Sequence, residues 1–275
     1  MTRSRWRIQR LDVTASTNDD VRRAAEAGET EGLVVVASQQ SAGRGRRGRV
    51  WESPVGNLYC STLLRPKNMP RNAGLYSFAA SLAVRDVVVP YIPNAAVTLK
   101  WPNDVLVSGK KISGILLEVA GDALIVGIGV NVLHSPKNAL YPATSLLEIL
   151  YQDGQQENGM PAFAGMTFSE ITFSKNTDTP AKAVAPFGFS QDQFLNALLD
   201  RLGHWHDLMQ TDGFAPVCTD WLKHAQQGSL TVRLSHETVQ GEFVGLDETG
   251  HLRLRLADGA ERSISTGDVV LPLKD

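Results

Sequence analysis

A short arginine-rich segment carries the strongest chemical signal in the chain. Residues 43–49 read Gly-Arg-Gly-Arg-Arg-Gly-Arg and follow a β-branched run that is typical of a buried strand. Glycines let backbone N–H groups approach an anion, and guanidinium groups match phosphate or carboxylate oxygens. A solvated basic loop or a nucleic-acid tract is the alternative, but this run is short and lies between the strand and Trp51. The segment is therefore expected to bind a small phosphorylated ligand.

A second candidate is the lysine that ends a later strand. Lys100 is followed by Trp101 and Pro102, and proline ends strand pairing because it lacks an N–H group. Open sheets assemble their sites at strand ends. A lysine there is usually solvated when it stands alone, but beside an arginine segment it can stabilise charge developing on a phosphate.

Further polar residues have an ordinary structural interpretation. Ser16, Thr17 and Asn18 precede a predicted helix, where their side chains can cap its exposed N–H groups, and this interpretation is favoured for the motif alone. The same groups can bind a polar ligand head. Asn131 ends an apolar run that contains Gly127 and Gly129, and its buried amide needs a partner.

The elements that must position these residues follow from hydrophobic periodicity. Short β-branched runs predict strands at residues 33–37, 97–100, 112–119 and 124–132. Apolar residues at helical spacing predict helices at residues 18–26, 75–89, 193–208 and 214–225. Mixed strands and helices indicate an α+β or α/β main domain.

The two remaining regions have a different character. Residues 151–186 are rich in Gln, Asn, Gly, Pro, Ser and Thr, and we expect a disordered surface insertion there. Beyond Gly228, alternation predicts short strands and a small barrel, with strands at residues 230–234, 238–244, 251–256 and 261–265. Arg253 and Arg255 are expected on the solvated face of a strand whose leucines point inward.

Composition excludes several classes of protein. The chain has 275 residues with Lys+Arg 27 and Asp+Glu 29, a net charge of −2, so no global basic field attracts nucleic acid or membranes. Cys60 and Cys218 lie far apart, which indicates neither a disulfide framework nor a zinc site. Polar residues follow the N-terminal arginines, and the apolar runs are too short to span a bilayer. We expect a cytoplasmic protein.

Five motifs follow one another along the chain. They are Ser16-Thr17-Asn18, the segment from Gln40 to Trp51, Lys100-Trp101-Pro102-Asn103-Asp104, Lys111-Ile112-Ser113-Gly114-Ile115-Leu116 and Gly127-Ile128-Gly129-Val130-Asn131. With these motifs in this order, the chain resembles the biotin protein ligase family. Each motif is weak alone, but five in order across about residues 12–147 make a chance match improbable.

The resemblance implies an enzyme that uses ATP with Mg²⁺ to convert biotin into biotinyl-5′-AMP, and then transfers biotin to a lysine. The acceptor would be a biotin carboxyl carrier domain of acetyl-CoA carboxylase or another biotin-dependent carboxylase. It assigns catalysis to Lys100 and Arg46, and nucleotide binding to Arg44, Arg46, Lys100 and Asn131, without protein ligands to a metal. It assigns biotin binding to Ser16, Thr17, Asn18, Gln40, Gly43, Arg44, Gly45, Arg46, Trp51, Lys100 and Gly114.

The implied architecture has two domains. Residues 1–226 would form an α+β catalytic domain with a mixed sheet, like class II aminoacyl-tRNA synthetases and biotin ligases, and residues 227–275 an SH3-like barrel. Some family members carry an N-terminal DNA-binding domain, but only fifteen residues precede Ser16. We therefore expect a short form that binds neither DNA nor membranes, as a monomer or a homodimer.

Two alternatives remain open at this point. A lipoate or octanoate ligase performs the same adenylation on a different acid, but Gln40 and the Ser16-Thr17 pair favour a ureido head with donors and an acceptor. A non-catalytic biotin-binding module is the other alternative. The presence of Arg44, Arg46 and Lys100 argues against it.

Overall fold

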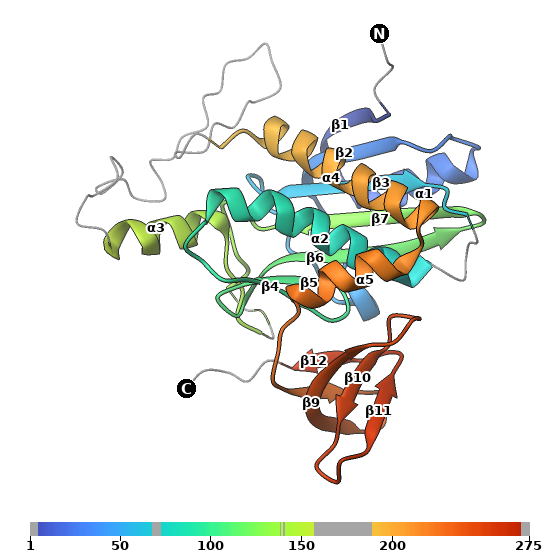
Figure 1. The fold of residues 1–275 in the computed structure, drawn as a ribbon. Coiled ribbons are helices and arrows are strands. Elements are labelled where there is room, and N and C mark those ends of the chain that lie inside the picture. Colours follow the sequence, from blue (N-terminus) through green and yellow to red (C-terminus); the bar gives the residue numbers. More distant parts are fainter. Residues whose placement is uncertain (1–4, 68–72, 138, 140, 157–188, 271–275) are drawn as a thin grey trace.

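Two β-sheets with covering helices make up the fold (Figure 1). The computed structural model describes residues 5–67, 73–137, 139, 141–156 and 189–270. The strands of the large sheet are β1 (Arg7–Thr14), β2 (Leu33–Gln40), β3 (Leu58–Leu64), β4 (Val97–Lys100), β5 (Asp104–Val107), β6 (Lys110–Ala120) and β7 (Ala123–Val130). The α-helices are α1 (Thr17–Glu26), α2 (Tyr76–Val88), α3 (Leu146–Gln156), α4 (Gln191–Thr211) and α5 (Phe214–Lys223).

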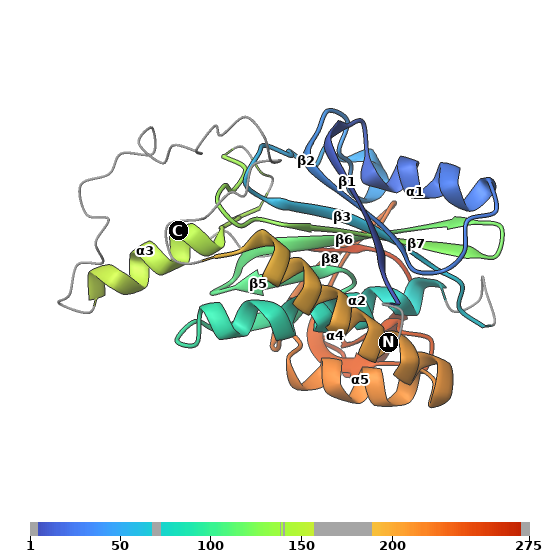
Figure 2. The same ribbon diagram turned by 90° about the horizontal axis from the view of Figure 1, so that it is seen from above.

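The large sheet is mixed and is covered on both faces. Its order is β1-β2-β3-β7-β6-β5-β4, with β1 and β2 parallel and every other neighbouring pair antiparallel. Helix α1 lies on one face, whereas α2, α4 and α5 lie on the other (Figure 2). This arrangement explains the uninterrupted apolar runs, because a sheet covered on both faces buries every side chain along a central strand. All seven residues of β3 are buried.

Two apolar cores result from this layering. Strand β2 alternates between them, since Val34 and Val36 join the main core while Leu33 and Val35 pack beneath α1 with Val21. The main core continues to α2 and α4. The predicted apolar face of α4 is confirmed, with buried side chains at Phe194, Leu195, Leu198, Leu199 and Leu202.

The predicted cap of α1 is wrong. Ser16 occupies the N-cap position, but its side chain makes no capping hydrogen bond. Thr17 and Asn18 lie within the helix and their side chains bond across to other strands instead. The tertiary partners of these groups outweigh the local capping preference.

The expected disordered insertion begins too early. Helix α3 extends to Gln156, so residues 151–156 are helical, and residues 157–186 lie outside the described residues. A capping box begins this helix, because Glu148 N donates to Ser145 Oγ at 3.2 Å and Ser145 N donates to Glu148 Oε2 at 3.3 Å. The Ser-x-x-Glu spacing is a sequence pattern that predicts the start of a helix, but the polar composition of the following residues favoured disorder.

The C-terminal strands form one antiparallel sheet in the order β11-β10-β9-β8-β12. The strands are β8 (Ser229–Arg233), β9 (Thr238–Leu246), β10 (Leu252–Arg255), β11 (Glu261–Ile264) and β12 (Asp268–Val270). Within the described residues β11 and β12 do not pair and the sheet does not close, so the predicted small barrel is not confirmed. Strand β12 is short, and its Val269 carbonyl accepts a hydrogen bond from Lys100 of the large sheet.

Smaller expectations about this region and about the whole chain can also be checked. Leu252 and Leu254 are fully buried, while Arg253 and Arg255 both pair with Glu261, which confirms the solvated-face interpretation. Both cysteines carry free thiols. No helix in the described part of the chain is long and apolar enough to cross a bilayer.

Candidate functional site

One cavity gathers most of the predicted residues. It lies where the start of α1, the arginine-rich segment, strands β3, β6 and β7 and the turn after β4 meet β12 of the small sheet. Gly43 and Asn131 are absent from its lining. The predicted residues that do line it are Ser16, Thr17, Asn18, Gln40, Arg44, Gly45, Arg46, Trp51, Lys100 and Gly114.

The first end of the cavity is polar and uncharged. Thr17 N donates to Gln40 Oε1 at 2.9 Å, and Thr17 Oγ1 lies 2.7 Å from Ser61 Oγ. Ser61 Oγ donates in turn to Asn18 Oδ1 at 2.6 Å. These contacts link α1, β2 and β3. The network presents hydroxyl and amide groups of both donor and acceptor character without any net charge.

A glycine on β7 makes this network possible. A Cβ atom at Gly127 would clash with Asn18 Oδ1, so only glycine leaves room for the Asn18 amide beside the strand. Gly43 has a comparable role in the arginine-rich segment, where an added Cβ would lie 2.5 Å from Trp51 O and 2.6 Å from Ser53 Oγ. Gly43 therefore contributes to the site by permitting a close approach of the backbone.

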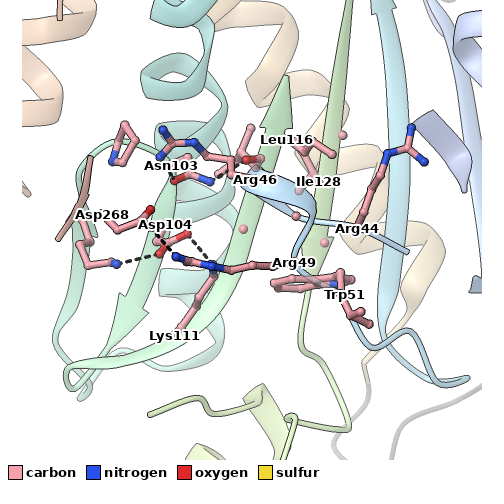
Figure 3. Close-up of a pocket in the computed structure, with 18 of the residues that line it drawn as sticks. Arg44, Arg46, Arg49, Trp51, Asn103, Asp104, Lys111, Leu116, Ile128 and Asp268 are labelled. Atoms are coloured by element: carbon pink, nitrogen blue, oxygen red, sulfur yellow. Dashed lines mark hydrogen bonds and ion pairs between the residues drawn. The ribbon is translucent and has the colours of Figure 1, made fainter. Parts of the chain in front are cut away.

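The second end of the cavity is cationic and buried. Lys100 is the last residue of β4 and Asp104 is the first residue of β5, and the two residues are paired in the antiparallel ladder. The turn that connects these strands contains the cis Trp101–Pro102 peptide. Lys100 Nζ lies 3.0 Å from Asp104 Oδ2, and Lys111 Nζ lies 2.5 Å from Asp104 Oδ1 (Figure 3). All three side chains are at most 9% exposed.

This cluster has an unbalanced charge. Burial alone would raise the pKa of Asp104, but the charges of Lys111 and Lys100 outweigh it and keep that pKa below its ordinary value. Burial likewise opposes the charge of Lys111, but Asp104 and then Tyr141 raise its pKa. Two ammonium groups therefore share one carboxylate, and the surplus positive charge can bind an anion in the cavity.

The arginine-rich segment folds back on itself over the cavity. Gly45 N donates to Arg49 O at 2.7 Å, and Trp51 N donates to Gly43 O at 2.9 Å. A short 3-10 turn, η1 (Arg46–Gly48), forms its tip. Internal hydrogen bonds therefore link the two ends of this loop.

Four arginines of the segment have different surroundings. Arg44 pairs with Asp19 and Glu118, whereas Arg47 and Arg49 pair with Asp268 of the small sheet. No carboxylate in the described part of the chain lies at ion-pair distance from the remaining arginine, Arg46. Burial lowers its pKa, and its Nη1 donates to Asn103 Oδ1 at 3.3 Å. Arg46 is thus the arginine of this segment whose charge is most available to a ligand.

Two further predicted residues have distinct environments. Trp51 Nε1 is buried and has no hydrogen-bond partner among the described residues, an orphan donor beside the cavity. Asn131 is buried behind the cavity, where its Nδ2 donates to Thr144 O at 3.0 Å. The partner that the sequence demanded for Asn131 is thus a backbone carbonyl.

Sequence reasoning did not identify several groups of this site. Asp104 and Lys111 lie within recognised motifs, and the presence of a buried carboxylate near two lysines was the missing inference. Tyr141 OH accepts from Lys111 Nζ at 3.3 Å, but nothing in its local pattern indicated that contact. Asp268 follows a glycine in the C-terminal region, and no local signal connects it with arginines more than two hundred positions earlier.

The geometry suits a ligand with a polar neutral head and an anionic tail. Hydroxyl and amide groups lie at one end, and the surplus cationic charge of Lys100 and Lys111 lies at the other. Arg46 covers the same cavity. Such a site can hold a carboxylate and a phosphate close together, because it neutralises the repulsion between two anions.

Comparisons with known proteins point in the same direction. Residues 10–135 match the Biotin/lipoate A/B protein ligase family, and residues 230–271 match the Biotin protein ligase C terminal domain. The chain is 34% identical over 255 residues to a Biotin--[acetyl-CoA-carboxylase] ligase of Paracoccus denitrificans, covering 89% of this chain and 92% of that protein. It is 31% identical over 271 residues to the Bifunctional ligase/repressor BirA of Bacillus subtilis, covering 94% and 72% of the two chains.

Solved structures share the fold. The biotin protein ligase from Aquifex aeolicus in complex with biotin and ATP superimposes with a TM-score of 0.72 at 26% identity, over 96% of this chain and 97% of that one. The Leishmania major enzyme in complex with biotinyl-5-AMP gives a TM-score of 0.59 at 25% identity, over 94% and 98%.

Proposed function

The chain belongs to the biotin protein ligase family, and from this premise we propose how its cavity carries out the reaction. The protein is an ATP-dependent biotin protein ligase that activates biotin as biotinyl-5′-AMP. The names of its relatives imply a biotin carboxyl carrier acceptor, as in acetyl-CoA carboxylase. The roles of the individual residues are our proposal.

The observation that carries the proposal is the contrast between the two ends of the cavity. Biotin has a ureido head with N–H donors and a carbonyl acceptor, and a carboxylate at the end of its tail. Thr17 and Gln40, which Ser61 holds in place from behind, offer matching neutral groups, while Lys100 and Lys111 attract the carboxylate. We propose that the other predicted residues also contact or shape the biotin site when the ureido head lies at the neutral end and the carboxylate at the cationic end. These residues are Ser16, Asn18, Gly43, Arg44, Gly45, Arg46, Trp51 and Gly114.

Adenylation brings two anions into contact. A biotin carboxylate oxygen attacks the α-phosphorus of ATP, a C–O–P linkage forms, and the bond from the α-phosphorus to pyrophosphate breaks. A Mg²⁺ ion bound to the ATP phosphates would neutralise part of the charge on the departing pyrophosphate. Lys100, Lys111 and Arg46 supply the cations that stabilise charge on the phosphoryl oxygens. In this scheme Asn131 does not contact the nucleotide directly. It acts through the backbone around Thr144, whose carbonyl accepts the hydrogen bond from Asn131 Nδ2.

Transfer follows when an acceptor lysine reaches the adenylate. The uncharged amine attacks the biotinyl carbonyl, an amide bond forms, the bond from that carbonyl to the AMP phosphate oxygen breaks, and the amine proton is lost to solvent. Water competes with this amine, because acyl adenylates hydrolyse readily. The arginine-rich segment covers the cavity and so protects the intermediate.

The test is pyrophosphate release with MgATP and, in parallel, biotin, lipoate or octanoate. We expect release with biotin alone, followed by a biotinyl mass increase on one lysine of an added carrier domain. A preference for lipoate or octanoate would keep the chemistry and overturn the substrate assignment. Silence with all three acids would favour a binding module.

Further features of the biological setting belong to the same proposal. We infer that the chain does not bind DNA, because arginines of its C-terminal sheet are neutralised by Glu261 and Glu237. A salt-dependent, sequence-specific DNA affinity would contradict this. We also propose a cytoplasmic location, in keeping with the free thiols. We propose domains at residues 1–226 and 227–275, the second an SH3-like unit. The protein is proposed to be a monomer or a homodimer, and analytical ultracentrifugation would distinguish the two.

A further inference from the structure

The strands of the small sheet carry four arginines, and three of them have carboxylate partners. Arg253 and Arg255 pair with Glu261, and Arg262 pairs with Glu237. Arg233, the last residue of β8, is the exception, because no carboxylate in the described part of the chain lies at ion-pair distance from its guanidinium. A permanently charged group without such a partner is available to an anionic ligand.

Arg233 is also the arginine of the small sheet that lines the cavity. Its neighbour Val232 is fully buried, so the alternation of β8 places Arg233 on the opposite, exposed face. Arg233 lies directly opposite Asp268 of β12 in the antiparallel ladder, and Asp268 lines the cavity too. The Asp268 oxygens contact Arg47 and Arg49 instead of Arg233. The small sheet therefore contributes an exposed cation to the rim of the cavity.

The strand order of the large sheet fixes the direction in which the cavity runs. Strands β2 and β3, which contribute to the neutral end, lie on one side, and β4, which ends at Lys100, is the edge strand on the other side. The small sheet lies beside that edge (Figure 1), where Lys100 Nζ donates to Val269 O at 3.1 Å. In Figure 3 Asp268 of β12 likewise lies on the side of Asp104 that faces away from Arg44. The path from the neutral end through the cationic end therefore continues to the small sheet.

The proposed adenylation has a direction of its own. In a displacement at phosphorus the attacking and leaving oxygens lie roughly in line, on opposite sides of the phosphorus. The biotin carboxylate reaches the α-phosphorus from the neutral end, so the pyrophosphate must leave on the side of the small sheet. The electron pair of the breaking bond stays on the pyrophosphate oxygen. This charge needs a cation beyond Lys100 and Lys111, which face the carboxylate and the α-phosphate.

We propose that Arg233 binds the β- and γ-phosphates of ATP and the pyrophosphate that forms from them. This assignment rests on the proposed function, because the side on which pyrophosphate leaves follows from the position of biotin. A guanidinium matches phosphate oxygens with two parallel N–H donors. Since both phosphates are charged before and during bond breaking, loss of this contact weakens MgATP binding more than it slows the chemical step. AMP and biotinyl-5′-AMP lack these phosphates and do not require Arg233.

The test compares Arg233→Gln with the wild-type protein in pyrophosphate release from biotin and MgATP. KM for MgATP should rise about tenfold, the scale of one partly exposed charge-assisted contact, while KM for biotin and kcat stay within about twofold. Arg233→Lys should recover part of the affinity, because it keeps the charge without the bidentate fork. Arg262→Gln removes the same charge from an exposed position of β11 outside the cavity lining and should change neither constant.

A second readout separates pyrophosphate from the rest of the nucleotide. Run in reverse, from biotinyl-5′-AMP and pyrophosphate to ATP and biotin, the reaction should show a similar rise in KM for pyrophosphate in Arg233→Gln. Transfer from preformed biotinyl-5′-AMP to an added carrier domain should keep its wild-type rate. An unchanged KM for MgATP, an equal effect of Arg262→Gln, or a slower transfer to the carrier domain would each overturn the proposal.

The role of Arg233 and the proposed function can fail separately. Turnover of biotin by the wild-type protein tests the function, whereas the ratio of variant to wild type tests Arg233. If the wild-type protein activates lipoate or octanoate instead, the same ratio is measured with that acid. If it activates none of the three, calorimetric titration with MgATP replaces KM, and equal affinities of Arg233→Gln and wild type, or no binding by either, would overturn the proposal.

Discussion

The two ends of the cavity are built on opposite electrostatic principles. At the neutral end, Thr17, Gln40 and Ser61 satisfy one another through hydrogen bonds, so burying them costs little. At the cationic end, Lys100 and Lys111 share a single carboxylate, and burial of the surplus charge is unfavourable until an anion enters. In the proposed scheme, the head of biotin is recognised by a complete hydrogen-bond network, while its carboxylate tail is activated by a cluster whose charge is incompletely paired.

The two ends also differ in what holds them together. The neutral end is assembled from α1, β2 and β3, which lie close in the sequence, and β2 and β3 are neighbours in the large sheet. The cationic end depends on both sheets, because Lys100 Nζ donates to Val269 O at 3.1 Å and Asp268 binds Arg47 and Arg49. Substitutions at the cationic end should therefore change stability or the rate of adenylation, whereas substitutions at the neutral end should change the KM for biotin.

The largest expected effect comes from removing the shared carboxylate. Asp104→Asn leaves both buried ammonium groups without a carboxylate and should lower the free energy of unfolding by about 3–5 kcal/mol. Urea unfolding followed by circular dichroism measures this. The control is Asp122→Asn, which removes an exposed partner of Arg65 and should leave the midpoint unchanged. Equal midpoints for both variants would show that the Asp104 carboxylate does not stabilise the buried lysines.

The next effect separates chemistry from binding. Lys100→Met should reduce pyrophosphate release with biotin and MgATP by about 10²–10³-fold, because the cation that stabilises the phosphoryl oxygens is lost. Stopped-flow detection of pyrophosphate provides the rate. Lys110→Met changes an exposed lysine on the same strand as Lys111 and should keep the wild-type rate. A rate near wild type in Lys100→Met would assign the stabilisation of charge to Lys111 and Arg46.

A substitution at the neutral end of the cavity should weaken biotin binding and leave the rate of the chemical step nearly unchanged. Thr17→Val removes the hydroxyl between Gln40 and Ser61, so KM for biotin should rise about tenfold or more while kcat changes little. Steady-state kinetics at saturating MgATP gives both constants. Thr219→Val, on the exposed surface of α5, is the matched control. A fall in kcat without a change in KM would break the division between the two ends.

The loop over the cavity should control retention of the intermediate. Arg46→Gly should still form biotinyl-5′-AMP, because both lysines remain, but the adenylate should leave the protein several-fold faster, since one half-buried cation that lines the cavity is gone. Chromatography of adenylate that passes a centrifugal filter measures the escape. Arg23→Gly, which removes an exposed arginine near the end of α1, should not increase it. Equal retention by Arg46→Gly and wild type would contradict this role.

The smallest effect is the pH dependence of the cationic end. The pKa of Asp104 is lowered in the folded protein, so its contribution to stability is fully present above its unfolded pKa of about 3.9 and disappears as the pH falls through the folded value. The stability difference between wild type and Asp104→Asn should therefore be constant near neutral pH and narrow below about pH 4. Urea midpoints at a series of pH values test this. A difference that widens in acid would reverse the sign.

Much of the fold was predictable because its signals are local. Predicted strands at residues 33–37 and 97–100 and the apolar face of α4 are confirmed, since hydrophobic periodicity reflects burial residue by residue. Family motifs likewise brought attention to Lys100 and the arginine-rich segment. The predicted cap at Ser16 is wrong and the predicted small C-terminal barrel is not confirmed, because both depended on contacts with distant parts of the chain.

The sequence by itself therefore determined the types of element, the absence of a large net charge and the candidate cations, all of which depend on residue type and spacing along the chain. The tertiary structure decided which charges meet. Asp104 lies between two lysines, Arg44 between two carboxylates, and Asp268 against arginines from the other sheet. Electrostatic interactions depend on distance and burial in space, and neither quantity is written in the order of the residues.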